Sequence, residues 1–369
     1  SNRIADIAVK EGRIVQVAEA LDRSQATQVI DSTGLYVSPG WIDLHSHVFF
    51  GFHSIAVRPD EDSGVYTGVT TAVEAGGFEA TNIDLFRREI IEKSLTRVLG
   101  FINISANRDT PLHGDWSRFD QKLTIQTMLD NLDILKGVKV MASNRHSANL
   151  GIIPTQLAVQ AARESGTRVM AHIGMAPPLV QDVLNLMEEG DIITHCFKGF
   201  PSGLFRRTGR PVQEAWQALE RGVGFDLGHG RLSFSWQAAR HARLHNFPLH
   251  SCSTDLHEGV INGPVWTFGR TMAKCLHMGY PLDEVVEMAT LGPARLIGEA
   301  KELGSLLPGS EADLTIFRLM EAPTVLTDSE DKSEIGKWDV EPVHCVRAGR
   351  VFSKMKIPPR EPEPEAADE

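Results

Sequence analysis

Cysteine is scarce in this sequence, and the few cysteines lie far apart. They are Cys196, Cys252, Cys275 and Cys345, and no two of them form a CxxC pair. A disulfide framework or a cysteine-rich zinc module needs closely spaced cysteines, so neither is indicated. The pattern fits a reducing compartment, and we expect a cytoplasmic protein.

Long apolar runs and an excess of basic charge are also missing. No apolar stretch approaches the roughly 18 residues of a membrane span, and no signal segment opens the chain, so no membrane partner is expected. The 37 Lys and Arg against 48 Asp and Glu give a net charge of −11, which argues against nucleic acid as a partner. The chain starts at Ser1 in strand-like sequence, and we expect that upstream residues are missing.

The middle of the chain has the rhythm of an α/β fold. With 42% hydrophobic residues, the 369-residue chain can bury a sizeable core. Apolar strand candidates alternate with helix candidates about every 30 residues, the span of one βα unit. Eight such units predict a (β/α)8 TIM-type barrel. The expected strands are 41–47, 69–75, 98–105, 138–142, 168–173, 192–197, 224–227 and 249–254, and the expected helices include 85–93, 156–164 and 233–245.

Both ends of the chain are rich in strand-like sequence and are predicted to pair into a small β-sandwich. The expected strands are 4–9, 13–17, 28–31 and 35–37 at one end, and 312–317 and 342–352 at the other. The predicted organisation is a sandwich part at 1–38, the barrel at 39–302, and a second sandwich part at 303–353. Residues 354–369, dominated by Pro, Glu, Lys and Ala, are expected to be a disordered tail.

The first barrel strand ends in His45-Ser46-His47. Residues two apart on a strand point to the same side, so both imidazoles face one point, which suits metal chelation. The HxH pattern is short, and taken alone it is equally compatible with two ordinary histidines.

Other metal-ligand types fall at the ends of other strands. His172 and His195 lie near the ends of the fifth and sixth strands, Asp255 closes the eighth, and Lys139 lies within the fourth. The carboxyl ends of barrel strands converge on one face, where active sites lie, so these side chains are expected to share a pocket.

Lys139 stands within an apolar strand, where a charged amine is costly to bury. A neutral amine can take up carbon dioxide to become a carbamate, whose two oxygens are enough to bridge two metal ions. The alternative is a lysine that extends its amine to solvent from the end of the strand.

The order of HxH on strand one, Lys on strand four, His on strands five and six, and Asp on strand eight resembles the binuclear metal site of the amidohydrolase superfamily. Segments 137–143, 190–197, 225–230 and 253–257 are similar to its dihydroorotase-like branch. The resemblance is greatest to deacetylases that act on acetylated hydroxy acids of the acetyl-(R)-mandelate type, or on related acyl amino acids. Proteins of this branch often carry the names dihydroorotase or adenine deaminase.

The resemblance implies that His45, His47, carboxylated Lys139 and Asp255 hold one metal ion. Lys139, His172 and His195 would hold the other. Zinc is the expected ion, although this ligand set also suits manganese or iron. The implied activity is removal of an acyl group, expected to be acetyl, from a small carboxylate-bearing ester or amide. A metal-bridging hydroxide would attack the carbonyl, and Asp255 would be the general acid and base.

A substrate carboxylate would need a cation, and Arg145, Arg108 and Lys198 all follow strand ends on the expected active face. Arg145 is the first choice, with a solvated loop arginine as the alternative. His229 and His257 are candidates for substrate contacts, or for ordinary hydrogen-bonded loop histidines.

Three other functions remain open. A cyclic amidohydrolase of the dihydroorotase or hydantoinase type is one, but dihydroorotases commonly have an arginine two residues after HxH, where this chain has Phe49. Deamination is disfavoured because no glutamate follows His172 in Ile173-Gly174-Met175-Ala176. A non-catalytic scaffold would have lost ligands, and all six are present. The oligomeric state is open, with a homo-oligomer among the options.

Overall fold

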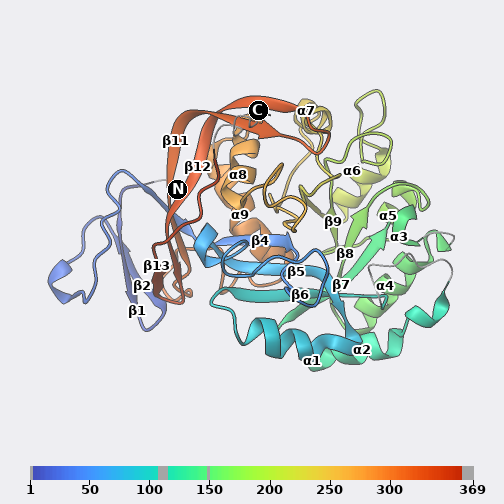
Figure 1. The fold of residues 1–369 in the computed structure, drawn as a ribbon, viewed down its shortest axis with the longest axis horizontal. Helices are drawn as coiled ribbons and strands as arrows, with labels where there is room; N and C mark the ends of the chain where they lie inside the picture. Colours follow the sequence, from blue (N-terminus) through green and yellow to red (C-terminus); the bar gives the residue numbers. More distant parts are fainter. Residues whose placement is uncertain (1–2, 107–114, 148–149, 360–369) are drawn as a thin grey trace, which may run out of the picture.

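The structure is a computed structural model that describes residues 3–106, 115–147 and 150–359 (Figure 1). Its centre is a sheet of seven parallel strands within these ranges, in the order β10-β9-β8-β7-β6-β5-β4. The strands follow one another along the chain and are neighbours in space, as in a TIM-type barrel. They are β4 (Trp41–Ser46), β5 (Val69–Glu79), β6 (Arg97–Asn103), β7 (Leu135–Ala142), β8 (Arg168–Ile173), β9 (Ile192–Thr194) and β10 (Gly224–Asp226).

The expected eighth strand, 249–254, is reduced to isolated bridges. Ser251 pairs in parallel with Asp226 of β10, and Leu256 pairs in parallel with Ser46 of β4, so this segment still closes the barrel. Regular pairing fails between them because the backbone N–H of Thr254 donates to the Asp43 carboxylate, 3.0 Å away, instead of to a neighbouring strand. The eighth strand therefore lies where it was expected, but the expectation of regular strand pairing there is wrong.

Alternate residues of β4, β5 and β6 build the inside of the barrel. Ile42, Leu44, Val73 and Phe101 belong to one buried cluster that also includes Met170 of β8. Their neighbours in the strands face the surrounding helices, so these strands are apolar on both faces. The helices are α1 (Ile83–Phe86), α2 (Gln121–Asp130), α3 (Asn144–Ser147), α4 (Ile153–Glu164), α5 (Val180–Leu186), α6 (Gln213–Glu220), α7 (Trp236–Leu244), α8 (Phe268–His277), α9 (Leu282–Ala289) and α10 (Leu291–Leu296).

Two expected helices are confirmed with small shifts, and one is interrupted. The expected helix 156–164 lies within α4, and 233–245 contains α7. The expected helix 85–93 is divided, because α1 ends at Phe86 and a π-helical segment, Arg87–Ile91, continues it.

Both chain ends contribute to a small β-sandwich, as expected. β3 (Tyr36–Pro39) pairs with β11 (Leu314–Thr327), which pairs with β12 (Ser333–Arg347), and β13 (Arg350–Phe352) completes this antiparallel sheet. β1 (Asp6–Lys10) and β2 (Arg13–Ala18) form a second sheet. Ile14, Ala312, Leu314 and Val346 form the core between the two sheets. Residues 28–31, expected as a strand, have no regular structure.

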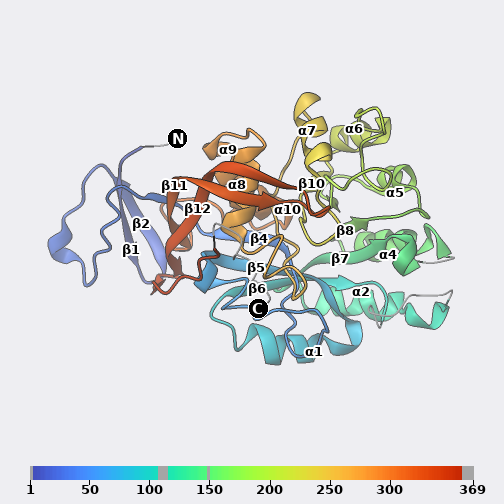
Figure 2. The same cartoon turned by 45° about the horizontal axis from the view of Figure 1, so that its top comes forward.

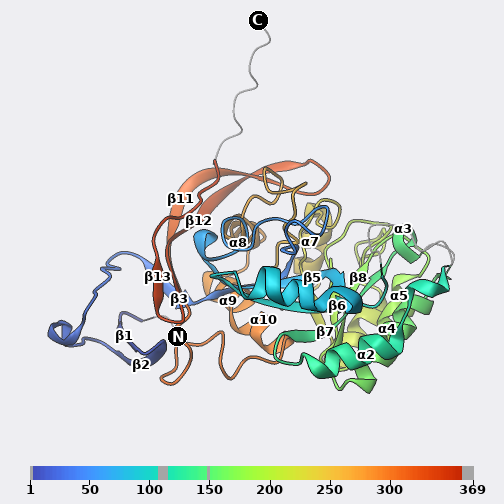
Figure 3. The same ribbon diagram turned by 60° about the horizontal axis from the view of Figure 1, so that its bottom comes forward.

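The hairpin of β11 and β12 is longer than expected, and it arches over the barrel in Figure 2 and Figure 3. Helix α8 lies between this hairpin and the barrel and contacts β12. The hairpin turn, residues 328–332, reaches the loop after β10, where the backbone N–H of Ser329 donates to the carbonyl of Phe234.

The segment after the sandwich is held against the barrel in its first part. The Lys356 amine pairs with Asp62 at 2.9 Å, and the Pro359 carbonyl accepts from the Arg270 guanidinium at 2.9 Å. The expected disorder is therefore not met at 354–359, and residues 360–369 lie outside the described residues. Within the described ranges, no helix combines the length and apolar character needed to cross a membrane.

Candidate metal centre

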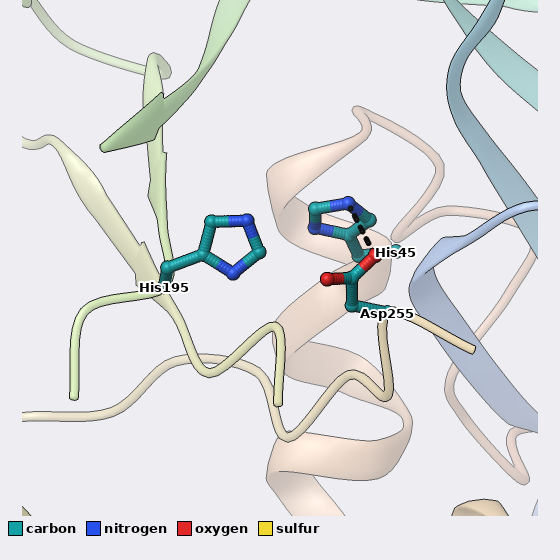
Figure 4. Close-up of side chains that lie close together, drawn as sticks. All are labelled: His45, His195 and Asp255. Carbon is teal, nitrogen blue, oxygen red and sulfur yellow. Dashed lines mark ion pairs between the residues drawn. The ribbon is translucent and has the colours of Figure 1, made fainter. Parts of the chain in front are cut away.

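The six side chains expected as metal ligands come together at the carboxyl ends of the barrel strands. Figure 4 shows three of them, His45, His195 and Asp255, pointing toward one another. These three place one ligand atom each within 4.8 Å of the others. His45 lies in β4, and His47 follows the last residue of that strand. Lys139 lies in β7 and His172 in β8. His195 follows the last residue of β9, and Asp255 lies in the segment that closes the barrel.

Short contacts join these side chains into one cluster. Oδ1 of Asp255 lies 3.1 Å from Nε2 of His47 and 3.4 Å from Nε2 of His45. The Lys139 amine lies 3.2 Å from Nε2 of His45. The ring centroids of His45 and His195 are 5.0 Å apart, which connects the two sides of the cluster.

His172, on the fifth barrel strand β8, joins the cluster through His195. Nδ1 of His172 lies 2.7 Å from Nε2 of His195, so the two rings face each other across the ends of β8 and β9. His172 is half-buried, whereas Lys139 and His195 are fully buried. The cluster is therefore enclosed by the barrel, and His172 lies on its more open side.

Burial disfavours the charged form of two imidazoles of the cluster, those of His45 and His172. It lowers the pKa of His45 well below the usual value, and the nearby Lys139 lowers it further. Burial likewise lowers the pKa of His172, with His195 adding to the effect. Burial alone would raise the pKa of Asp255, but the contact with His47 brings it below its ordinary value. Neutral imidazoles and an ionised carboxylate are the protonation states that bind metal ions.

The hydrogen bonds of His45 fix its tautomer. Its Nδ1 lies 2.8 Å from the Thr194 hydroxyl, and that hydroxyl donates to the Asp226 carboxylate at 2.7 Å. Because the hydroxyl proton is used toward Asp226, Nδ1 of His45 must donate to Thr194. The lone pair of His45 is then on Nε2, which faces the cluster.

His47 and His195 are oriented in the same way by other acceptors. Nδ1 of His47 donates to Oε1 of the fully buried Glu74 at 3.1 Å. Nδ1 of His195 donates to the carbonyl of Gly228 at 2.6 Å. Each ring therefore turns its Nε2 toward the centre, where a metal ion would take the place of a proton, and such outer partners are typical of metal-binding histidines.

The donor set fits a divalent cation. Two ligand atoms that each lie about 2.0–2.2 Å from one ion are roughly 3.0–3.5 Å apart. The contacts of Asp255 with His47 and His45, at 3.1 and 3.4 Å, have this separation. Without a proton between them, the lone pairs of Nε2 and of the carboxylate repel each other, and a cation removes that repulsion.

Two of the converging residues have unusual backbones. His195 has φ 73° and Asp255 has φ 49°, in the left-handed region that non-glycine residues rarely adopt. Both positions end a strand segment, and the surrounding contacts must hold this conformation. The strained backbone conformations therefore lie at positions where the side chains converge.

The residues expected to contact substrate are placed differently from one another. Lys198 is half-buried, its amine donates to the carbonyl of Leu232, and it lies within electrostatic range of Asp255. His257 packs beside His47 at a centroid distance of 6.3 Å. Arg145 is exposed on α3. Arg108 lies outside the described residues.

His229 is not brought to the cluster. Its ring is fully buried, with Nδ1 donating to the carbonyl of Gly230 at 2.9 Å and Nε2 lying 2.6 Å from the Lys274 amine. Both ring nitrogens therefore have hydrogen-bond partners outside the six expected ligands.

Sequence reasoning missed the residues that orient the ligands. Glu74, Thr194 and Asp226 are all buried polar residues within apolar strands. Asp43 is another, and its carboxylate accepts from the Thr254 hydroxyl at 2.5 Å. Buried polar residues in otherwise apolar strands were the available signal, since such groups need partners.

Comparisons with known proteins identify the family of this chain. Residues 238–351 match the model of the Amidohydrolase family. A deacetylase from Enterococcus faecalis is 35% identical over 354 residues, covering 94% of this chain and 95% of the relative. This chain belongs to the amidohydrolase family. It is a hydrolytic enzyme, the resemblance found in the sequence is confirmed, and the family implies use of a divalent metal at the His and Asp cluster.

Two solved structures match nearly the whole chain. One described as an adenine deaminase has a TM-score of 0.89 at 34% identity, covering 95% of this chain and 96% of the other. One described as a dihydroorotase has a TM-score of 0.88 at 33% identity, covering 97% and 94%. These similar proteins carry three different activity names, so the names alone do not select a reaction.

Proposed function

We propose that this amidohydrolase binds two divalent metal ions, expected to be zinc, at the cluster. His45, His47, Asp255 and a carboxylated Lys139 hold one ion. His172, His195 and the same Lys139 carbamate hold the other. The observation that carries the proposal is the position of the Lys139 amine, which is fully buried and 3.2 Å from Nε2 of His45.

The surroundings of Lys139 support the carbamate. Its amine is fully buried, beside His45 and 3.4 Å from the Met170 sulfur, and burial disfavours a charged ammonium. The neutral amine attacks carbon dioxide, forming a C–N bond and releasing one proton. The product is an anion with two oxygens, which suits two adjacent cations.

The metal ions and the protein side chains have different roles in the proposed reaction. When bound, the two ions lower the pKa of water and polarise the acyl carbonyl. Asp255 accepts the proton of the attacking water and gives it to the departing alkoxide or amine. Its Oδ1 faces His45 and His47, at the centre of the cluster.

We infer that the reaction is removal of an acetyl group from a small carboxylate-bearing ester or amide. The relative named deacetylase, similar over nearly all of both chains, supports this choice. Lys198 is the side chain best placed to bind the substrate carboxylate, because its amine lies within electrostatic range of Asp255. Arg145 on α3 is the second cation for this role.

His257 is proposed as a further substrate contact. Its Nδ1 is buried and has no hydrogen-bond partner among the described residues. A buried ring nitrogen without a partner is costly, and a polar substrate atom would satisfy it. The His257 ring lies beside His47, at the edge of the cluster.

A cyclic amidohydrolase of the dihydroorotase type is the second candidate, favoured by the similar structure described as a dihydroorotase. Phe49 argues against a function of the dihydroorotase type. This position, where dihydroorotases commonly have arginine, is 1% exposed, and its ring packs edge-on against Phe86 at 5.5 Å. No cation is presented to substrate from there.

A panel of substrates tests the reaction. The zinc-loaded protein is assayed in parallel with O-acetyl hydroxy acids, N-acetyl amino acids, dihydroorotate, a hydantoin and adenine, with Asp255→Asn as the background control. Acetate release from a carboxylate-bearing substrate, absent in the control, is the expected result. Ring opening of dihydroorotate without acetate release would overturn the deacetylase assignment.

We also propose a cytoplasmic location and a small-molecule substrate rather than a macromolecular one. The four cysteines are free and buried, which is typical of a reducing compartment. The enclosed cluster suits a small substrate.

A further inference from the structure

The turn formed by residues 228–230 lies directly against two of the proposed ligands. The Gly228 carbonyl accepts the Nδ1 proton of His195 at 2.6 Å. A Cβ added to Gly230 would lie 2.1 Å from Oδ2 of Asp255. Both glycines have φ 48°, so this close approach requires their left-handed backbone. The position of the turn therefore sets the position of both ligands.

Backbone hydrogen bonds tie the same turn to the segment that carries Asp255. The N–H of His229 donates to the Ser253 carbonyl at 3.2 Å, and the N–H of Gly230 donates to the Thr254 carbonyl at 2.9 Å. A shift of the turn would consequently move the Asp255 backbone as well as its side chain.

The side chain of His229 connects the turn to Lys274. Its Nδ1 donates to the Gly230 carbonyl, so Nε2 is an acceptor, and it lies 2.6 Å from the Lys274 amine. The His229 ring also packs on Phe234 at a centroid distance of 4.7 Å. The Lys274 amine therefore holds the His229 ring in position.

Lys274 is a fully buried lysine on α8 whose amine has three hydrogen-bond acceptors. They are Nε2 of His229 at 2.6 Å, the Pro264 carbonyl at 2.8 Å and the Thr327 carbonyl at 2.7 Å. Burial lowers the pKa of this amine well below its usual value and the nearby Arg270 lowers it further, while the Asp328 carboxylate favours the charged form. The three acceptors come from three separate parts of the chain, so the amine fixes these parts relative to one another.

The third part is the end of the long β11–β12 hairpin. Thr327 ends β11, and two residues later the Ser329 hydroxyl donates to the Gly230 carbonyl at 3.0 Å. The hairpin from the small sheet therefore reaches the turn from the same side as Lys274.

We propose that Lys274 is a positioning residue for catalysis, acting through His229 and the 228–230 turn on His195 and Asp255. The inference rests on the proposed metal roles of these two residues. Lys274 does not touch the cluster itself. Its effect on the ligands depends on its hydrogen bonds rather than on its charge.

The test compares Lys274→Met with Lys136→Met. Lys136 is also a buried lysine, but it begins β7 and pairs with Glu299 at the opposite end of the barrel, so its loss controls for removal of a buried amine. Zinc affinity is measured by competition with a chelator, and Tm, kcat and KM are measured on the zinc-loaded proteins. We expect Lys274→Met to weaken zinc binding about 10-fold or more and to lower kcat with little change in KM, and Lys136→Met to do neither.

Two further variants keep the test decisive if Lys274→Met does not fold. In His229→Gln, the amide can still accept from Lys274 and donate to Gly230, whereas His229→Leu can do neither. We expect zinc affinity and kcat to be preserved in the glutamine variant and reduced in the leucine variant. Zinc affinity and kcat within about twofold of the wild type in both Lys274→Met and His229→Leu would overturn the inference. If the wild-type protein itself binds no zinc, the proposed metal centre fails instead.

Discussion

Glu74 holds His47 in place from a neighbouring strand. Oε1 of Glu74 accepts the Nδ1 proton of His47 at 3.1 Å, and the two oxygens together accept the backbone N–H groups of Val48, Phe49 and Gly77 at 2.5–2.8 Å. The carboxylate is fully buried. It therefore fixes both the tautomer of His47 and the turn that follows it, without touching the centre of the cluster.

We predict that Glu74→Gln lowers metal affinity or activity about 10- to 100-fold, the usual effect of losing the outer partner of a metal-binding histidine. The amide no longer offers two acceptor oxygens to the backbone and is a weaker acceptor for His47. Metal content after dialysis and kcat/KM are the measurements. Glu79→Gln is the matched control, since Glu79 ends the same strand but is only partly buried. Equal effects of the two substitutions would contradict the assigned role of Glu74.

We predict that Lys139→Ala loses bound metal and activity together, because the carbamate would supply a ligand to both ions. Short carboxylic acids, which present two oxygens in the same space, are expected to restore part of the activity. Metal analysis and rate measurements with and without added acid provide the check. Full metal content in the unrescued variant would exclude a bridging lysine.

We predict that Asp255→Asn retains metal but loses about 100-fold or more of kcat, the usual contribution of a general acid and base. The amide still offers an oxygen toward His45 and His47 but cannot accept the proton. Metal content and turnover are measured on the same preparation. Unchanged turnover would remove Asp255 from the mechanism.

Much of this site follows from the sequence because strand geometry is local. The two-residue spacing of His45 and His47 fixes their common direction, and the barrel brings the ends of β7, β8 and β9 to the same face. Even the irregular segment around Asp255 lies where the strand pattern predicted it.

The partners of these residues could not be predicted in the same way. Glu74 reaches His47, and Thr194 reaches His45, only because of the register between different strands, which the sequence does not display. The direction of His229 depends on Lys274, 45 positions later. The length of the β11–β12 hairpin was underestimated because its outer half alternates less clearly and packs on α8 rather than in the sandwich.

Lys198 is predicted to select the substrate carboxylate. Lys198→Met should raise KM about 10-fold or more for a carboxylate-bearing substrate, since a charge-assisted contact is lost, with little change for its neutral methyl ester. Arg145→Met, assayed in parallel, separates the two cations. If only the arginine variant discriminates between acid and ester, Arg145 holds this role.

Stability should depend on the helix layer around the barrel. Leu184→Ala in α5 removes a fully buried side chain and is predicted to lower the free energy of unfolding by about 2–5 kcal/mol. Leu244→Ala, at the end of α7, removes a side chain that is 74% exposed and should change it by less than about 0.5 kcal/mol. Denaturant unfolding measures both, and similar values would contradict the packing described here.

An anomalous diffraction map of crystals of the zinc-loaded protein would show directly whether the six side chains hold two metal ions. We expect two zinc peaks about 3.5–4 Å apart among these side chains, with density for a carboxyl group extending from the Lys139 amine between them. A single peak, or an unmodified Lys139 turned away from the metal, would contradict it.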